Sequence, residues 1–399
     1  MKTIRIYEMF AGIGSQYKAC KNIEKELDVR FESLGACEWF IDAVIGYMKI
    51  HYGQIESENS LSKQEMTLLL SNYSWSADSK KPVRENYFLT MKEEKLRKIF
   101  PYLFGFVNKE YLSKKINNDF HGGGGQSYTN IKKIEILPKN IDILTYSFPC
   151  QDISQQGSQK GITKQTRSGL LFEVERILKN NKDRLPKVLL LENVKALASY
   201  KFNKDFTNWL NTLKELGYES KWKVINSVDY GSVQNRERVF CVSYLSKNKE
   251  FDFPKRIENK RTLKAIIKNE IDMQECNKLL KYFKDDFYVT KNNISKTKLV
   301  GYTNFNSEAY IYLPDKLGPT LTASGANSRL KFYFKETNEL KFISAKQAFL
   351  YMGFDKKDYQ AIKKDDLLNE SKMIFLCGNS ISVEVLEHLF KEMILCEIV

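Results

Sequence analysis

Cys150 and Glu192 are the residues whose types and surroundings most clearly suggest chemistry. Cys150 lies in Ser147-Phe-Pro-Cys-Gln-Asp152, on a loop that Pro149 stiffens. A thiolate is a strong nucleophile, although a lone cysteine is commonly a small buried apolar residue. Glu192 ends the apolar run Leu189–Leu191. A carboxyl group in apolar surroundings can keep its proton and donate it, so the pair favours attack by a thiolate with help from an acid.

Two arginines form a third candidate motif. Arg236 and Arg238 occupy alternate positions of Gln234-Asn-Arg-Glu-Arg238 and could face an anionic oxygen, or form a ladder of surface salt bridges. The sequence has three histidines and seven cysteines without paired Cys-x-x-Cys spacing. These counts disfavour a Cys–His hydrolase and a metal site, and they favour reduced thiols.

Strands and helices that alternate along the first half must position these side chains. This alternation predicts an α/β fold with a mostly parallel sheet covered on both faces. Active sites of such sheets lie at the carboxyl ends of the strands, where the candidate residues fall. The predicted strands are Ile4–Tyr7, Arg30–Ala36, Asp142–Ser147, Val188–Leu191 and Val239–Ser243; the predicted helices are 15–27, 41–52, about 169–179, about 206–216, 345–352 and 382–392.

Two segments interrupt the alternation. Residues 53–130 are polar and Lys-rich, and their tract Gly122–Gly125 favours a flexible surface loop over a phosphate cradle, because neither a strand nor Gly-Lys-Ser/Thr adjoins it. Residues 246–340 are basic and aromatic and indicate a second, smaller domain. We therefore predict domains at 1–245 and 246–341, and a return to the first domain over 342–399.

Charge and hydropathy limit the partners. The chain carries 63 Lys and Arg against 49 Asp and Glu, a net charge of 63 − 49 = +14. This surplus favours a polyanionic partner, nucleic acid first, although an AT-rich genome also biases composition toward lysine. No apolar run approaches the roughly 18 residues that span a bilayer, and the N-terminus lacks the apolar core of a secretory signal. We expect a cytoplasmic protein with no membrane partner.

A glycine turn indicates a bound nucleotide. Phe10-Ala-Gly-Ile-Gly14 follows the first strand and opens a helix, so its backbone N–H groups could face a ligand. Glu38 ends the second strand and could accept both hydroxyls of a ribose, and Trp39 could stack on an adenine or lie in the core. Together they favour an adenosine-containing cofactor, NAD or S-adenosylmethionine.

With these motifs in order, the chain resembles the DNA (cytosine-5)-methyltransferase family. The resemblance rests on Phe10–Gly14, Phe148-Pro-Cys-Gln151, Glu192-Asn-Val194, Gln234-x-Arg-x-Arg238 and Gly378-Asn-Ser380. Asn304–Tyr312, Gly318–Arg329 and Gln155-Gln156-Gly157 look like the mollicute enzymes that methylate CG. The resemblance implies a Rossmann-like methyltransferase domain that uses S-adenosyl-L-methionine, with a smaller target-recognition domain.

The resemblance also implies roles for individual residues. Cys150 adds to C6 of a cytosine flipped out of the duplex, and Glu192 holds or protonates N3 and contacts the 4-amino group. Arg238, supported by Arg236, holds either the base carbonyl or the geometry of the attacking loop. The implied cofactor residues are Phe10, Ala11, Gly12, Ile13, Gly14, Glu38, Trp39, Asn130, Pro149, Leu171, Asn379 and Ser380. Asn130 stands where the family usually has an Asp. The implied DNA contacts are Ser154, Gln155, Gln156, Thr322, Ser324 and Arg329.

The expected partner is double-stranded DNA, for a monomer that could accompany a cognate restriction endonuclease. Three other functions agree less well with the motifs. An NAD-dependent oxidoreductase would need a third glycine and an acid or base for hydride transfer. An RNA cytosine-5 methyltransferase of the same fold would carry Cys-Phe-Thr, which does not occur here. Intact Cys150 and Glu192 argue against a non-catalytic DNA-binding module.

Overall fold

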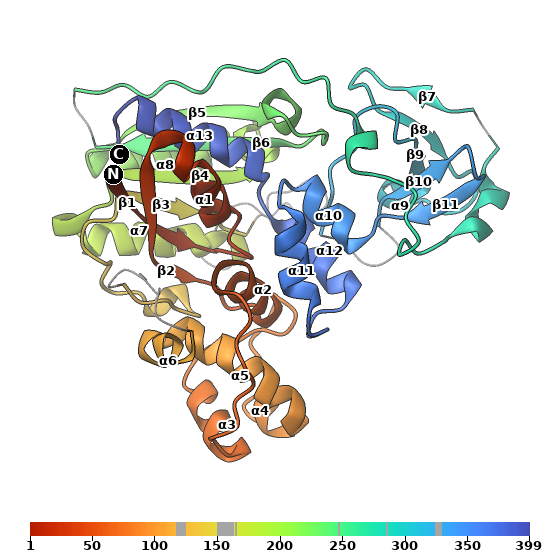
Figure 1. Cartoon of the computed structure of the whole chain (residues 1–399). Helices are drawn as coiled ribbons and strands as arrows, with labels where there is room; N and C mark the ends of the chain where they lie inside the picture. Colours follow the sequence, from red (N-terminus) through yellow and green to blue (C-terminus); the bar gives the residue numbers. More distant parts are fainter. Residues whose placement is uncertain (117–124, 150–162, 164–165, 246–247, 285, 324–328) are drawn as a thin grey trace. The chain divides into compact units, whose positions relative to one another are not determined.

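A computed structural model describes residues 1–116, 125–149, 163, 166–245, 248–284, 286–323 and 329–399. The chain forms two compact units (Figure 1). The first unit comprises Met1–Ile225, Glu237–Pro254 and Leu386–Val399, and the second comprises Asn226–Arg236 and Lys255–Val385. The boundaries of these units differ from those of the predicted domains, 1–245, 246–341 and 342–399. Recognition of DNA by residues 246–341 stays a prediction.

The first unit contains a six-stranded sheet in the order β2-β1-β3-β4-β6-β5. β1 pairs in parallel with β2 and β3, β3 pairs in parallel with β4, and β6 runs antiparallel to β4. The predicted α/β fold with a mostly parallel sheet is therefore confirmed. The strands are β1 (Lys2–Met9), β2 (Val29–Cys37), β3 (Ile143–Tyr146), β4 (Val188–Val194), β5 (Glu219–Asn226) and β6 (Glu237–Tyr244).

Helices cover both faces of this sheet because its strands bury side chains on both sides. On one face, α7 and α8 contribute Val174, Trp209 and Leu213 to a core shared with β1, β3, β4 and β6. On the other, Phe390 of α13 lies 6.4 Å from Phe31 of β2, measured between ring centroids. The helices are α1 (Ser15–Leu27), α2 (Ile41–Tyr52), α7 (Leu171–Asn180), α8 (Asn203–Glu215) and α13 (Val383–Leu395); the 3-10 helices are η1 (Ile131–Lys133), η2 (Arg167–Leu170), η3 (Lys182–Arg184) and η4 (Lys195–Ala198).

The described part of residues 53–130, where no helix was predicted, contains four helices. They lie together beyond the β2 edge of the sheet in Figure 1, and the longest of them, α5, packs on α2. The buried side chains Leu96, Phe100 and Leu103 of α5 give this insertion its own apolar contacts. The helices are α3 (Lys63–Ser71), α4 (Tyr87–Thr90), α5 (Glu93–Val107) and α6 (Lys109–Lys115).

The second unit contains a five-stranded sheet in the order β11-β10-β9-β8-β7. Its strands are short, and Leu299, Ile311 and Leu340 lie in a small core on the sheet. The strands are β7 (Tyr288–Val289), β8 (Ser295–Lys298), β9 (Tyr310–Tyr312), β10 (Lys331–Phe334) and β11 (Glu339–Phe342); the helices are α9 (Asn306–Ala309), α10 (Ala345–Tyr351), α11 (Lys356–Lys363) and α12 (Glu370–Asn379), with 3-10 helices η5 (Ser227–Tyr230), η6 (Leu263–Ala265) and η7 (Asn277–Tyr282).

Among the described residues, one helical stretch, Glu370–Leu395, reaches the length and apolarity of a membrane span. The sequence predicted no such stretch. Its most apolar window is 72% buried inside the protein, as is usual for core helices, so it is weak evidence for a membrane segment.

Candidate functional site

The glycine turn between β1 and α1 is open on one side and closed on the other. Phe10, Gly12 and Gly14 have φ angles of 58°, 57° and 76°, in the left-handed region. A Cβ on Gly14 would lie 2.2 Å from Nε2 of His51, so this position requires glycine. A Cβ on Gly12 would meet no atom within 4 Å. The turn can therefore admit a ligand beside Gly12.

Glu38 joins this turn to the end of β2. Its carboxylate accepts hydrogen bonds from the backbone N–H groups of Gly12 (2.9 Å), Trp39 (2.8 Å) and Phe40 (2.8 Å). Burial raises the pKa of Glu38, while these three hydrogen bonds oppose the rise. A carboxylate has about four acceptor positions, so capacity remains for a ligand hydroxyl. The structure thus brings together three of the predicted cofactor residues.

Two further segments flank Glu38 and Trp39. The carbonyl of Tyr128 accepts from the N–H of Glu38 (3.0 Å), and the N–H of Ser76 donates to the carbonyl of Trp39 (2.9 Å). Asn130 follows in the first segment: its Oδ1 accepts from the N–H of Lys132 (3.0 Å), and its Nδ2 donates to Oγ of Ser74 (3.4 Å). Asn130 therefore lies at the end of the insertion and contacts Ser74, which follows its first helix.

The segment that leads to Cys150 is held by neighbouring elements. Asn193 of β4 donates to the carbonyl of Phe148 (3.1 Å), and Ser168 of η2 donates to the carbonyl of Pro149 (2.7 Å). Leu171, a predicted cofactor residue, is buried in the core. Cys150, Ser154, Gln155, Gln156 and Ser324 lie outside the described residues.

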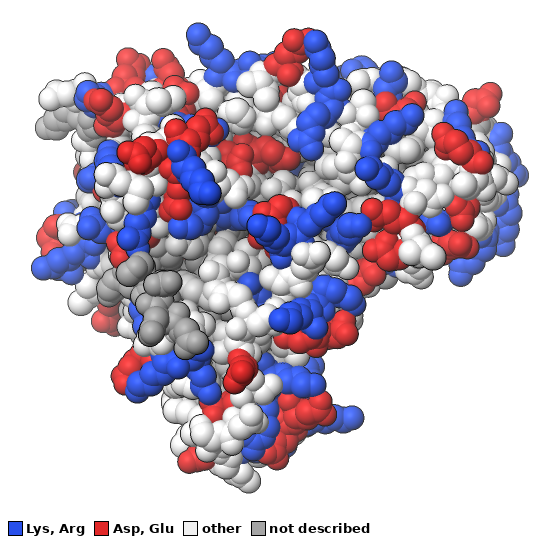
Figure 2. Space-filling model, in the orientation of Figure 1, with Lys and Arg blue, Asp and Glu red and all other residues white. Residues whose placement is uncertain are grey.

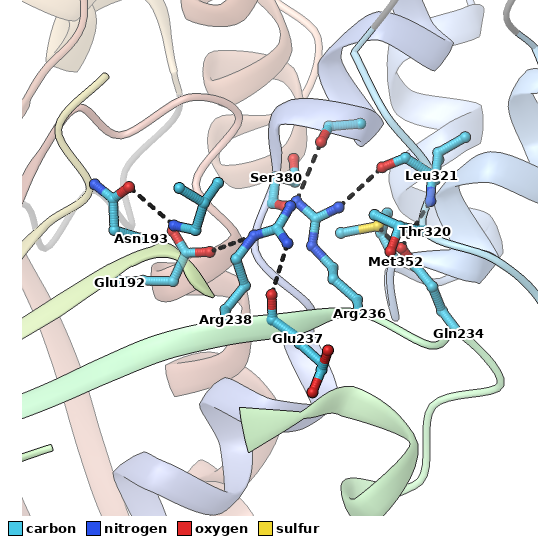
Figure 3. Close-up of polar contacts among 12 residues, drawn as sticks. Glu192, Asn193, Gln234, Arg236, Glu237, Arg238, Thr320, Leu321, Met352 and Ser380 are labelled. Atoms are coloured by element: carbon cyan, nitrogen blue, oxygen red, sulfur yellow. Dashed lines mark hydrogen bonds and ion pairs between the residues drawn. The ribbon is translucent and has the colours of Figure 1, made fainter. Parts of the chain in front are cut away.

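Glu192 and Arg238 form an ion pair at the carboxyl end of β4 (Figure 3). The antiparallel register of β4 and β6 places Val194 opposite Arg238, so both side chains lie at the same end of the sheet. Oε1 of Glu192 lies 3.3 Å from Nε of Arg238, and the two side chains are 10% and 19% exposed. The pair keeps both charges compensated in a partly buried place.

Arg236, which the sequence placed in catalysis beside Arg238, binds backbone carbonyls of the second unit (Figure 3). Its guanidinium donates to the carbonyls of Leu321 (2.9 Å), Ser380 (2.9 Å) and Gly378 (3.2 Å), and the residue is 5% exposed. The guanidinium therefore joins the segment before Thr322 to the turn that contains Ser380.

Gln234, for which no role was predicted, also binds the segment before Thr322. Its Nε2 donates to the carbonyl of Tyr351 (3.1 Å), and its Oε1 accepts from the N–H of Leu321 (2.9 Å). Gln234 also forms a parallel bridge with Gly318. Its place in Gln-x-Arg was a signal, because an amide can pair both with a donor and with an acceptor of neighbouring backbone.

The remaining predicted residues lie in the second unit. Arg329 stacks on Phe342 at 4.6 Å and donates to Gln274. Gly378 approaches the backbone of Thr322 so closely that a Cβ would lie 2.5 Å from its carbonyl carbon. Asn379 is exposed at the end of α12.

The fold and these motifs define a class of protein. Residues 109–395 match the family model of C-5 cytosine-specific DNA methylases, and the chain belongs to this family. The predicted family and its Rossmann-like methyltransferase fold are thus confirmed, and the protein is a DNA (cytosine-5-)-methyltransferase.

Individual relatives agree with this assignment. The chain is 42% identical over 393 residues to the orphan methyltransferase M.SssI of Spiroplasma monobiae, which covers 97% of this chain and 96% of the relative. It is 29% identical to the type II methyltransferase M2.ScrFI of Lactococcus lactis subsp. cremoris, over 98% and 99% of the two chains. In fold it is similar to the S. pombe Dnmt2 methyltransferase, with a TM-score of 0.59, 14% identity and 97% coverage of both chains.

Proposed function

We propose that the protein transfers a methyl group from S-adenosylmethionine to C5 of cytosine in double-stranded DNA, at CG sites, after Cys150 attacks C6 of a flipped base. One observation carries this proposal. β4 supplies both Glu192, paired with Arg238, and Asn193, which binds the carbonyl of Phe148 two residues before Cys150. The nucleophile's segment and the acidic group are therefore held by adjacent residues of one strand.

The glycine turn fits the cofactor. The open space beside Gly12 can take the chain of an amino acid, and Glu38 can accept from ribose hydroxyls. S-adenosylmethionine, when bound, supplies the activated methyl group. Gly12 and Glu38 would hold it and Trp39 would stack on its adenine, and the resemblance adds Asn130, Asn379 and Ser380 to the residues that would bind it.

Cys150 overcomes the weak nucleophilicity of C5. Its thiolate forms a bond to C6, and the electron pair of the C5–C6 double bond moves into an enamine whose C5 can attack the methyl group. Glu192 stabilises this state by contact with N3 and the 4-amino group, in the orientation that Arg238 gives it. Transfer of the methyl group to C5 breaks its bond to the sulfonium sulfur, and that electron pair stays on S-adenosylhomocysteine. The proton on C5 then passes to water, its electron pair re-forms the C5–C6 double bond, and the S–C6 bond breaks, which restores the thiolate.

DNA must reach this edge of the sheet with its target base unstacked, at a cost of a few kcal/mol. Lys and Arg side chains are interspersed with Asp and Glu on the face shown in Figure 2, so the charge of +14 does not mark one DNA-binding patch there. We assign recognition to Thr322, Ser324 and Arg329. The resemblance of Gly318–Arg329 to enzymes that methylate CG supports CG as the site.

Bisulfite sequencing of a plasmid from an expressing host tests the site. We expect conversion-resistant cytosines at CG alone. Resistance at other cytosines with equal efficiency would contradict the CG assignment while leaving the reaction in place. Labelled S-adenosylmethionine, incubated with duplex DNA or tRNA, tests the substrate: label should enter DNA only.

A further inference from the structure

A cavity in the insertion has no part in the reaction described above. It has a volume of about 410 Å³ and is formed by residues of the loop between Ala77 and Thr90. Lys81 and Arg84 contribute cationic side chains to its wall, and Tyr87 and Asn86 contribute groups that can donate hydrogen bonds. Both cationic residues are exposed, so the cavity is open to a ligand from solvent.

The cations of this cavity differ from those of the neighbouring helices. In α5 and α6, charged side chains pair with each other, as in Arg97–Glu93 (2.6 Å), Lys98–Glu94 (2.6 Å) and Lys114–Glu110 (2.7 Å). Lys81 and Arg84 form no ion pair with any residue that the structure describes. Lys81 interacts electrostatically with the nearby carboxylate of Asp78, so the charge of Arg84 is the more available of the two to an anionic ligand.

The acid in the cavity wall is engaged by its own loop. Asp78 accepts hydrogen bonds from the backbone N–H groups of Lys80 (2.8 Å) and Lys81 (3.0 Å), which lower its pKa. Lys80 and Glu85 are exposed on the same loop without lining the cavity. The loop thus has three cations against two acids, a net charge of 3 − 2 = +1, and the ionised carboxylate of Asp78 remains in the cavity wall while it holds the turn.

The loop is fixed at the edge of the sheet where the proposed reaction takes place. Ser76 pairs with the residues after β2, because its N–H donates to Trp39 and its carbonyl accepts from Ile41, both at 2.9 Å. The carbonyl of Ser79 accepts from Arg167, at the start of η2. β1, β2, β3 and β4 are parallel, so the ends of β2, β3 and β4 lie at one edge.

We propose that this cavity binds a backbone phosphate of the DNA duplex, with Lys81 and Arg84 as its contacts. The proposal rests on the proposed function, because that function brings DNA to this edge. A phosphodiester carries one negative charge at every nucleotide, and an arginine can donate two parallel hydrogen bonds to it. Contacts of this kind position a duplex without reading its sequence.

The test compares charge removal here with charge removal elsewhere. The variant is Lys81→Gln/Arg84→Gln, and the matched control is Lys139→Gln/Lys182→Gln. Lys139 and Lys182 are exposed and precede β3 and β4, at the opposite edge of the sheet. Fluorescence anisotropy would give the association constant for a labelled duplex between about 50 and 200 mM salt.

Each phosphate contact contributes about 0.9 to the slope of log association constant against log salt. Because one phosphate is bound, we expect the double variant to lose about 0.9 from this slope, on CG-containing and CG-free duplexes alike, and the control to keep the wild-type slope. Lys81→Arg/Arg84→Lys should also keep it, because the charges remain. Thermal unfolding would verify that each variant folds.

An unchanged slope in the folded double variant, or an equal loss in the control, would overturn the inference and leave the proposed function standing. A wild-type protein that binds no duplex would overturn both. Inorganic phosphate at constant ionic strength separates a site for a free anion. If phosphate raised the unfolding temperature of the wild type but not of the double variant, while their slopes agreed, the DNA assignment would be wrong.

Discussion

Two arginines separated by one residue in the sequence belong to different units and have different partners. Arg238, in the first unit, faces the carboxylate of Glu192, whereas Arg236, in the second, donates to three neutral carbonyls. An ion pair can turn a reactive carboxylate toward a substrate. Hydrogen bonds to carbonyls of distant segments instead fix the backbone. Alternate arginines in one motif therefore need not share a task.

The proposed chemistry belongs to the first unit, so loss of its nucleophile should have the largest effect on turnover. Cys150→Ser should abolish turnover, because a serine alkoxide is hardly populated at neutral pH. Duplex binding should persist, since phosphate contacts supply much of the affinity. A duplex with 5-fluorocytosine should form a covalent adduct with the wild type only. An adduct on a different cysteine would refute the assignment.

Loss of the acidic group of Glu192, in the same unit, should have the next largest effect on turnover. Glu192→Gln keeps the shape of the side chain and removes its charge and its proton exchange. We expect kcat to fall by about 10²–10⁴-fold, the usual range for acid–base groups. Cofactor affinity, measured by calorimetry, should stay at the wild-type value. Normal turnover in this variant would remove Glu192 from the mechanism.

Conservative lysine substitutions should separate the two arginines. Arg236→Lys cannot span three carbonyls, and loss of two buried hydrogen bonds should lower the free energy of unfolding by about 2 kcal/mol. Arg238→Lys keeps the opposite charge beside Glu192, so it should change stability by less than about 1 kcal/mol. Its kcat should fall by about tenfold because the carboxylate loses its orientation. Urea unfolding and steady-state kinetics would measure both; identical profiles for the two variants would contradict the division of tasks.

The last predicted effect concerns the pH dependence of stability, and it should arise in the first unit. Glu8 of β1 accepts from the hydroxyl of Tyr47 (2.8 Å), and burial raises its pKa from 4.5 to about 7. The folded state therefore binds more protons than the unfolded state between these values, so stability falls as pH rises through this window. The slope should approach 1.4 kcal/mol per pH unit at most. Glu8→Gln should flatten this slope in a series of thermal unfolding measurements at different pH values.

The sequence predicted the elements whose apolar periodicity is local. The helices at 15–27 and 41–52 agree with α1 and α2 at both ends. The meeting of Gly12 with Glu38 was likewise predictable, because the ends of adjacent parallel strands lie at one edge. β5 was missed because it is a strand at the sheet edge with few buried residues and so lacks an apolar run.

The partners of Arg236 could not be predicted from spacing. Leu321, Gly378 and Ser380 offer backbone carbonyls, which every residue has, so their types carry no signal. The helices of the insertion were hidden for another reason. Charged residues such as Glu93 and Arg97, which pair with each other, fill the first half of α5 and give it the polar composition of the surrounding segment.

The partners of Arg236 also bear on the order in which the molecule is completed. They follow it by 85, 142 and 144 residues in the chain. During synthesis on the ribosome, Arg236 cannot bind the carbonyl of Ser380 until residue 380 has emerged. The first unit likewise includes Leu386–Val399. Each unit therefore includes residues beyond position 380, and a nascent chain that has not yet reached Leu321 contains Cys150 without any of these partners of Arg236.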